Sequence, residues 1–127
     1  MSSHIEALTT AALSAALDAA SRQHALTATN IANAGSSGYT PARLSFAEQL
    51  ATAQGVLREN GRLDAGAIDA LRSMRDATPE AAEGTGSVQL DVEMTELARN
   101  AVHFQALVQG LARHLSLLAM AAADGRK

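Results

Sequence analysis

The feature that most constrains this fold is a heptad repeat near the C-terminus. Apolar or small residues recur there at alternating steps of four and three over more than four unbroken repeats. This spacing is typical of a helix that packs one face against another helix. Burying each large apolar side chain contributes roughly 1.5–3 kcal/mol, so the repeat predicts a packing partner. The repeat, which we call the seam, consists of Leu90, Met94, Leu97, Ala101, Phe104, Val108, Leu111, Leu115, Leu118 and Ala122.

A second helical pattern begins near the N-terminus. Ser3 and Glu6 fit a capping box, and we expect a helix from about Ser3 to Asn33, with Gly35 in the left-handed C-terminal cap position. One face of this helix is the natural first partner of the seam. That face fills little volume, so we expect neighbouring subunits to complete the burial. It consists of Leu13, Leu17, Ala20, His24, Thr27 and Ile31.

Between the two long helices the helical pattern weakens. Gly38 and Pro41 break it, and Ser45 with Glu48 fits another capping box, which predicts a short helix over residues 44–53 that ends near Gly55. Six glycines and prolines interrupt residues 55–86, where only residues 67–75 resemble a helical turn or two. We expect this segment to be mobile or dependent on a partner. Order resumes at Ser87 or Asp91, either of which can cap the last helix.

The predicted fold is therefore all-α, with long N- and C-terminal helices packed as an antiparallel coiled coil or helical hairpin. We divide the chain into an N-terminal helix (1–34), a loop with a short helix (35–55), a mobile or partner-dependent middle segment (56–86) and a C-terminal heptad helix (87–127). An alanine-rich chain of 127 residues with two Phe, one Tyr and no Trp favours long helical interfaces over a deep core.

Charge and cysteine content exclude several classes of function. The net charge is −3 and no stretch gathers Lys and Arg, so nucleic acid is not an expected partner. There is no Cys, hence no disulfide framework or thiolate metal site. The N-terminus lacks the pattern of a cleaved signal, and no segment has a run of ~18 apolar residues, so we expect no membrane insertion.

Two blocks of the sequence resemble the bacterial flagellar rod and hook proteins. The first contains Asn30, Asn33, Gly38 and Tyr39, and continues through Ala42, Arg43 and Phe46. The second runs through residues 88–94 and continues through Leu97, Ala98, Asn100, Ala101 and residues 104–107. Together they cover about half of the chain, one block at each end. Ser36 and Ser37 replace the usual Thr-Pro of the family, and Thr40 replaces a common Lys.

This resemblance implies a structural subunit of the flagellar basal body, without a catalytic site, whose terminal helices pack as a coiled coil and stack into a hollow rod. Such a subunit transmits torque, lines the export channel and lies in the periplasmic rod. The implied partners are copies of itself, other rod subunits, the MS-ring and rod-adaptor proteins, and the flagellar type III export apparatus, which exports the chain uncleaved. Helical stacking of identical surfaces is an open-ended contact, as a rod requires.

Several residues have both a functional and a plain structural interpretation. Phe46 and Leu50 are similar to a motif with which early flagellar substrates dock on the export gate, but they are also spaced as two anchors of a short amphipathic helix. Asn30 and Asn33 are more easily explained as helix-end capping residues than as ligands. Tyr39 could pack on its own subunit or on a neighbour, and the resemblance favours the neighbour.

We predict neither an enzyme nor a cofactor or metal site. His103 and His114 are eleven residues apart, roughly 16 Å along one helix, and His4 and His24 lack partners at helical metal-ligand spacing. No nucleophile elbow, phosphate loop or zinc-protease motif is present. The alternatives to a rod subunit are a cytosolic helical adaptor or secretion chaperone, which would form a small closed oligomer, and a helical-bundle enzyme or ligand carrier. A carrier would need a lined pocket.

Overall fold

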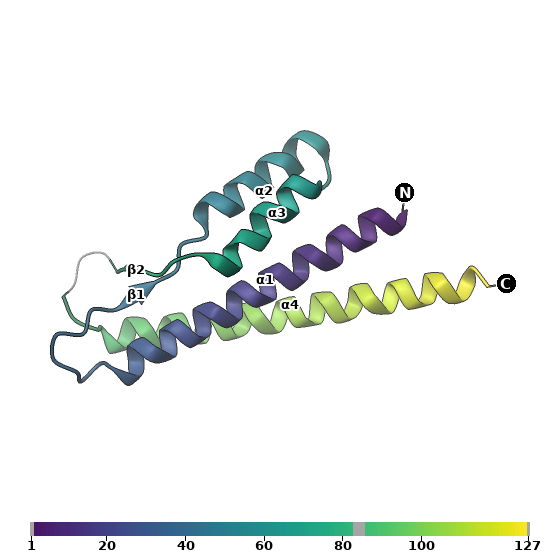
Figure 1. The fold of residues 1–127 in the computed structure, drawn as a ribbon. Helices are drawn as coiled ribbons and strands as arrows, with labels where there is room; N and C mark the ends of the chain where they lie inside the picture. Colours follow the sequence, from purple (N-terminus) through teal and green to yellow (C-terminus); the bar gives the residue numbers. More distant parts are fainter. Residues whose placement is uncertain (1, 83–85, 127) are drawn as a thin grey trace.

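The central helix of an elongated molecule lies between a second long antiparallel helix and a short helical hairpin (Figure 1). The computed structural model describes residues 2–82 and 86–126. Helix α1 (Ser2–Ala32) packs along helix α4 (Leu90–Asp124) on one side and against the hairpin of α2 (Ala47–Asn60) and α3 (Ala65–Ser73) on the other. The prediction of an all-α fold with long terminal helices in a hairpin is confirmed.

Three contacts define the register of α1 against α4. The Asn100 amide donates to the carbonyl of Ala20 at 2.8 Å, and the His114 ring nitrogen Nε2 lies 3.4 Å from the carbonyl of Glu6. At the other end of the pair, the Asn30 amide donates to the carboxylate of Glu93. The two helices therefore run antiparallel, with Glu6 opposite His114 and Ala20 opposite Asn100. Residues of α4 beyond about Leu118 have no part of α1 opposite them.

The central position of α1 explains its alanine content. Ala15 and Ala19 are buried in a cluster with Ala53, Ala67, Ile68, Leu71 and Met74, which come from α2, α3 and the short 3-10 helix η1 (Met74–Asp76). Ala20 is buried too, at the α4 contact. Small side chains let two neighbours approach one helix from different sides. The densest core therefore lies between α1 and the α2–α3 hairpin, and α3 contributes its most completely buried residues.

The middle segment is attached to α1 by side-chain and backbone bonds. The Arg22 guanidinium donates to the carbonyls of Met74 and Ala77 at 3.0 and 2.8 Å. A two-residue ribbon joins the segment to the loop after α1, because β1 (Ala42–Arg43) pairs antiparallel with β2 (Glu80–Ala81). Mobility of residues 56–86 in solution stays a prediction, but the structure places helix and core residues there.

The predicted bounds of α1 agree with the structure to within one residue, whereas the predicted bounds of the other helices differ from it. Gly35 has no left-handed backbone; the positive φ of 78° belongs to Gly38. Gly55 does not end the short helix, which continues to Asn60 and ends at Gly61 with a φ of 68°. Glycine interrupts a helix only weakly when the turns on both sides are good helix formers.

The predicted caps of α2 and α4 are also wrong. Helix α2 begins after Phe46, which makes no side-chain cap bond. Helix α4 begins after Gln89, again without a side-chain cap. The backbone amide of Glu93 donates to the carbonyl of Gln89 at 3.0 Å in the first turn of α4. The side chains of the Ser3 and Glu48 boxes lie in part outside the described residues.

Candidate assembly interface

The residues that resemble the flagellar signature form a buried polar cluster where α1, β1 and α4 meet. Asn30 is fully buried, and its side-chain amide makes two hydrogen bonds as a donor and two as an acceptor. Its Nδ2 donates to the carbonyl of Ala42 at 2.9 Å and to Glu93 Oε2 at 3.1 Å. Its Oδ1 accepts from the Tyr39 hydroxyl at 2.8 Å and from the backbone amide of Ala42 at 3.1 Å. Asn30 therefore connects three elements, which is a larger role than capping a helix.

Glu93 is the acidic member of this cluster. Only 1% of it is exposed, and its Oε1 accepts from the Arg43 guanidinium at 2.5 Å. Arg43 is itself about one third exposed, so the pair reaches from the interior to the surface. A buried carboxylate is tolerated when it is paired and hydrogen-bonded, and Glu93 has both kinds of partner. We call Asn30, Tyr39, Arg43 and Glu93 the polar cluster.

The other signature residues have local roles. The Asn33 amide donates to the carbonyl of Thr29 at 2.8 Å, near the end of α1, which agrees with the capping interpretation. Gly38 supplies the left-handed turn that returns the chain to Asn30. The Tyr39 hydroxyl bonds within its own chain, while the rest of its ring is half-buried. The Tyr39 hydroxyl therefore has a hydrogen-bond partner without a neighbouring subunit, and a contact of the ring with a neighbour stays a prediction.

The structure divides the predicted seam between two environments. Leu97, Leu111 and Leu118 are half-buried, as are Leu13, Leu17 and Ile31 of the α1 face. The remaining large seam residues are exposed on α4: Leu90, Met94, Phe104, Val108 and Leu115. Polar residues occupy much of the line that meets α1, because Glu93, Asn100 and His114 lie there with Leu97 and Leu111. The seam is therefore only partly covered by α1.

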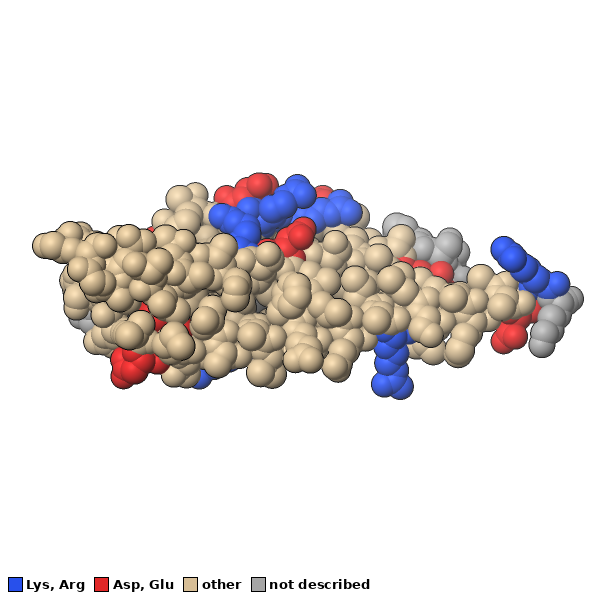
Figure 2. Space-filling model, turned by 90° about the horizontal axis from the view of Figure 1, so that it is seen from below, with Lys and Arg blue, Asp and Glu red and all other residues tan. Residues whose placement is uncertain are grey.

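Helix α4 carries nearly all of the exposed large apolar surface in the described residues. Val92, Val102, Leu117 and Met120 add to the exposed seam residues, and Leu57 is the one such side chain on another element. Seen from below Figure 1, the side on which α1 and α4 lie, most of the surface is uncharged (Figure 2). A helix that leaves this many large apolar side chains exposed is a candidate interaction surface.

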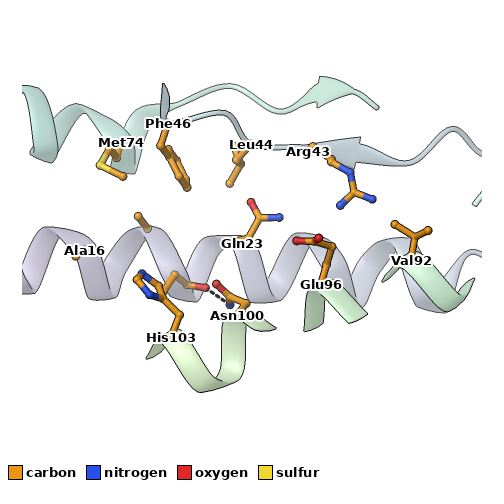
Figure 3. Close-up of a pocket in the computed structure, with 12 residues that line it drawn as sticks. Ala16, Gln23, Arg43, Leu44, Phe46, Met74, Val92, Glu96, Asn100 and His103 are labelled. Carbon is orange, nitrogen blue, oxygen red and sulfur yellow. Dashed lines mark hydrogen bonds between the residues drawn. The ribbon is translucent and has the colours of Figure 1, made fainter. Parts of the chain in front are cut away.

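Two grooves flank the contact between α1 and α4. The larger, of about 460 Å³, lies under the chain from β1 to α2, and Leu44 and Phe46 face Gln23 and Asn100 across it (Figure 3). The smaller, of about 260 Å³, is lined by Ser21, His24, Asn100, Ala101 and Phe104. Its wall on α4 includes two seam residues, so the uncovered seam borders a hollow between the helices.

Phe46 precedes α2 and is packed against the core cluster. The side chain of Leu50 lies outside the described residues, so the structure shows only that its backbone is helical. The export interpretation of this pair stays a prediction. The half-buried position of Phe46 means that docking through its ring would require it to leave the core.

His103 lines the larger groove and His114 contacts α1, and the described residues contain no group of three or more His, Cys, Asp or Glu that could hold a metal. By length and composition alone α4 could cross a membrane, although no uninterrupted apolar run was found in its sequence. One such helix is weak evidence for a membrane span, and none of its most apolar window is buried in the structure.

Sequence reasoning missed Glu93 and Arg43 as members of the site. Both lie within the blocks that resemble the flagellar family, but the resemblance by itself does not show that a charged residue is buried. The available signal was the spacing, since Glu93 lies four residues before Leu97 and seven before Asn100. A carboxylate on the inward line of a helix predicts a buried partner.

Fold and site together define a helical hairpin with a buried polar cluster at its closed end and an uncovered apolar face along α4. An uncovered apolar face of this kind is typical of surfaces that contact another protein. No protein-family model matches the chain, and no match is found among curated proteins.

Proposed function

We propose that this protein is a structural subunit that assembles helically through its terminal helices. The observation that carries the proposal is the apolar face of α4, where Met94, Val108 and Leu115 are each more than two fifths exposed. An isolated chain gains nothing from leaving these side chains in water, whereas burial between subunits stabilises an assembly. The proposal includes no catalytic activity.

Among helical assemblies, the resemblance of both ends of the chain favours the axial proteins of the bacterial flagellum. Within that family the stretch from Val88 to Met94, continued through residues 97–107, is most similar to the proximal rod protein FlgB. The polar cluster supports the comparison, because it gives the resembling residues Asn30, Tyr39 and Glu93 one shared physical role.

As a proximal rod subunit the protein would lie in the periplasmic part of the basal body. Its partners would be copies of itself, other rod subunits, the MS-ring and rod-adaptor proteins, and the type III export apparatus. Its task would be to transmit torque and to line the export channel. An open-ended helical contact between unlike faces of α1 and α4 would suit this task.

Sedimentation combined with circular dichroism tests the assembly on the purified full-length chain. We expect particles whose size grows with concentration without a fixed limit, and a helical signal that rises with them. A stable, fully helical oligomer of one closed size would contradict the proposal and would favour the cytosolic adaptor or secretion chaperone.

Isolated basal bodies of the source bacterium test the location, because a rod subunit must be found in them.

A further inference from the structure

Apolar packing alone leaves the register between α1 and α4 poorly determined. The seam repeats every seven residues, so Leu97, Leu111 and Leu118 would meet similar surroundings after a shift of one repeat. The opposing surface of α1 is rich in small side chains, which distinguish one position from the next only weakly. A second arrangement of the hairpin, shifted by about 10.5 Å along α4, would bury similar apolar groups.

The polar contacts of the interface do not repeat along the seam, and the polar cluster contains the buried carboxylate among them. A shift of seven residues would bring Asn100 or Gly86 opposite Asn30 in place of Glu93. Asn30 would lose its bond to the carboxylate, and Glu93, now 1% exposed, would lose both Asn30 and Arg43 while still close to the interface. A buried carboxylate without partners is strongly unfavourable.

We propose that Asn30, Arg43 and Glu93 are positioning residues that select the register of the hairpin. A single buried polar contact is the best-attested way in which helical interfaces specify register. The selection extends to the loop, because Asn30 also holds both backbone groups of Ala42. The inference deepens the proposed function, since register decides which seam residues face outward and how far α4 extends past α1.

Cysteine crosslinking reads the register directly, because the chain contains no Cys. Leu13 and Leu107 lie midway between the contacts at Glu6 and Ala20, so L13C with L107C reports the native register. The pairs E6C with L107C and A20C with L107C report shifts of one repeat, and they keep the Asn100 and His114 contacts because Glu6 and Ala20 take part in these only through backbone carbonyls. These pairs are too far apart in the native register, because a disulfide requires Cα atoms within about 7 Å.

The decisive variant is the double replacement N30L with E93L in the full-length chain. The double replacement removes the buried carboxylate together with its amide partner. Ala42, Tyr39 and Arg43 each lose a hydrogen-bond partner, so we expect the hairpin to fold with reduced stability. We expect crosslinking of the shifted pairs to rise by about tenfold or more relative to the wild type. The single variant E93L, which also removes the carboxylate, is measured in parallel.

Leu111→Ala is the matched control, because it removes packing from the same interface without touching the polar cluster. It should lower stability and leave the crosslinks in the native register. If either cluster variant keeps its helical signal and still crosslinks only through L13C and L107C, the proposal is overturned. Loss of the helical signal in both variants also overturns it, because the cluster would then be required to fold the hairpin and not to choose between registers.

The crosslinks are measured on the isolated chain under conditions where it does not assemble. Crosslinks that contradict the register proposal would not affect the rod assignment. Absence of the protein from basal bodies would contradict the rod assignment without affecting the register proposal. The two proposals can therefore fail separately.

Discussion

At the scale of single residues, two asparagines near the end of α1 differ sharply in what they hold. Asn30 makes four hydrogen bonds in the interior, whereas the Asn33 side chain makes one bond to Thr29 at an exposed position. Their similar spacing in the sequence conceals this difference, because only the direction of the side chain decides which one is buried.

We therefore expect Asn30→Ala to lower the free energy of unfolding by about 3 kcal/mol, since it leaves Glu93 and Ala42 with unsatisfied buried groups. Asn33→Ala should cost at most about 1 kcal/mol, because one exposed bond is lost. Urea unfolding followed by circular dichroism measures both. Equal losses in the two variants would mean that the cluster around Asn30 is not formed in solution.

Two glycines of the loop after α1 provide a second matched pair. Gly38 has a φ of 78°, whereas Gly35 has no positive φ and has space around it for a Cβ atom. Gly38→Ala should lower stability by about 1–2 kcal/mol, because an L-residue is strained in the left-handed region. Gly35→Ala should change it by less than about 0.5 kcal/mol. Thermal unfolding of the two variants checks this, and a larger loss at Gly35 would place the left-handed turn where the sequence pattern first suggested.

At the scale of elements, α4 has one face for its own chain and another that the chain leaves uncovered. Leu111 lies on the line that meets α1 and is half-buried, while Val108, three residues earlier, is 43% exposed. The two residues belong to the same predicted seam. Introducing the same charge at each position separates folding of the hairpin from its assembly.

Leu111→Asp should unfold or strongly weaken the hairpin, because a charge without a partner would be buried against α1. Val108→Asp should leave the helical signal and the unfolding midpoint of the dilute chain nearly unchanged, yet prevent growth of the assemblies in sedimentation. Motility and basal bodies should be lost with both variants. Growth of normal assemblies by the Val108→Asp protein would show that this face of α4 is not the contact between subunits.

Periodicity predicted the two long helices and their hairpin because a heptad repeat is a property of one helix and needs no knowledge of the partner. It could not predict which line of α4 meets α1, because Glu93 and Asn100 interrupt the apolar pattern on that line. Nor could it predict that α1 has a second neighbour. Ala15 and Ala19 have no distinctive pattern, and the burial of Ala67 and Ile68 against them depends on how the middle segment folds back.

At the scale of the whole molecule, the helices form three layers, in which α1 has neighbours on two sides and α4 on one (Figure 1). Arg22 and the β1–β2 pair hold the α2–α3 hairpin to one side of α1, so this side is occupied within the chain. The side of α4 away from α1 is open along its length. An assembly can therefore add subunits along α4 without displacing the core between α1 and α3.

Hydrogen exchange should show this difference in protection along the chain. In dilute solution we expect the slowest exchange in the middle of α1, around Ala15 to Thr27, where several residues are buried, and fast exchange in α4 beyond Leu118, which has no part of α1 opposite it. On assembly the C-terminal turns of α4 should become protected, because exposed Leu115 and Met120 enter an interface. Mass spectrometry at two protein concentrations measures this, with the Val108→Asp variant as the control that should gain no protection. Equal protection of α1 and the end of α4 in the dilute chain would contradict the layered arrangement.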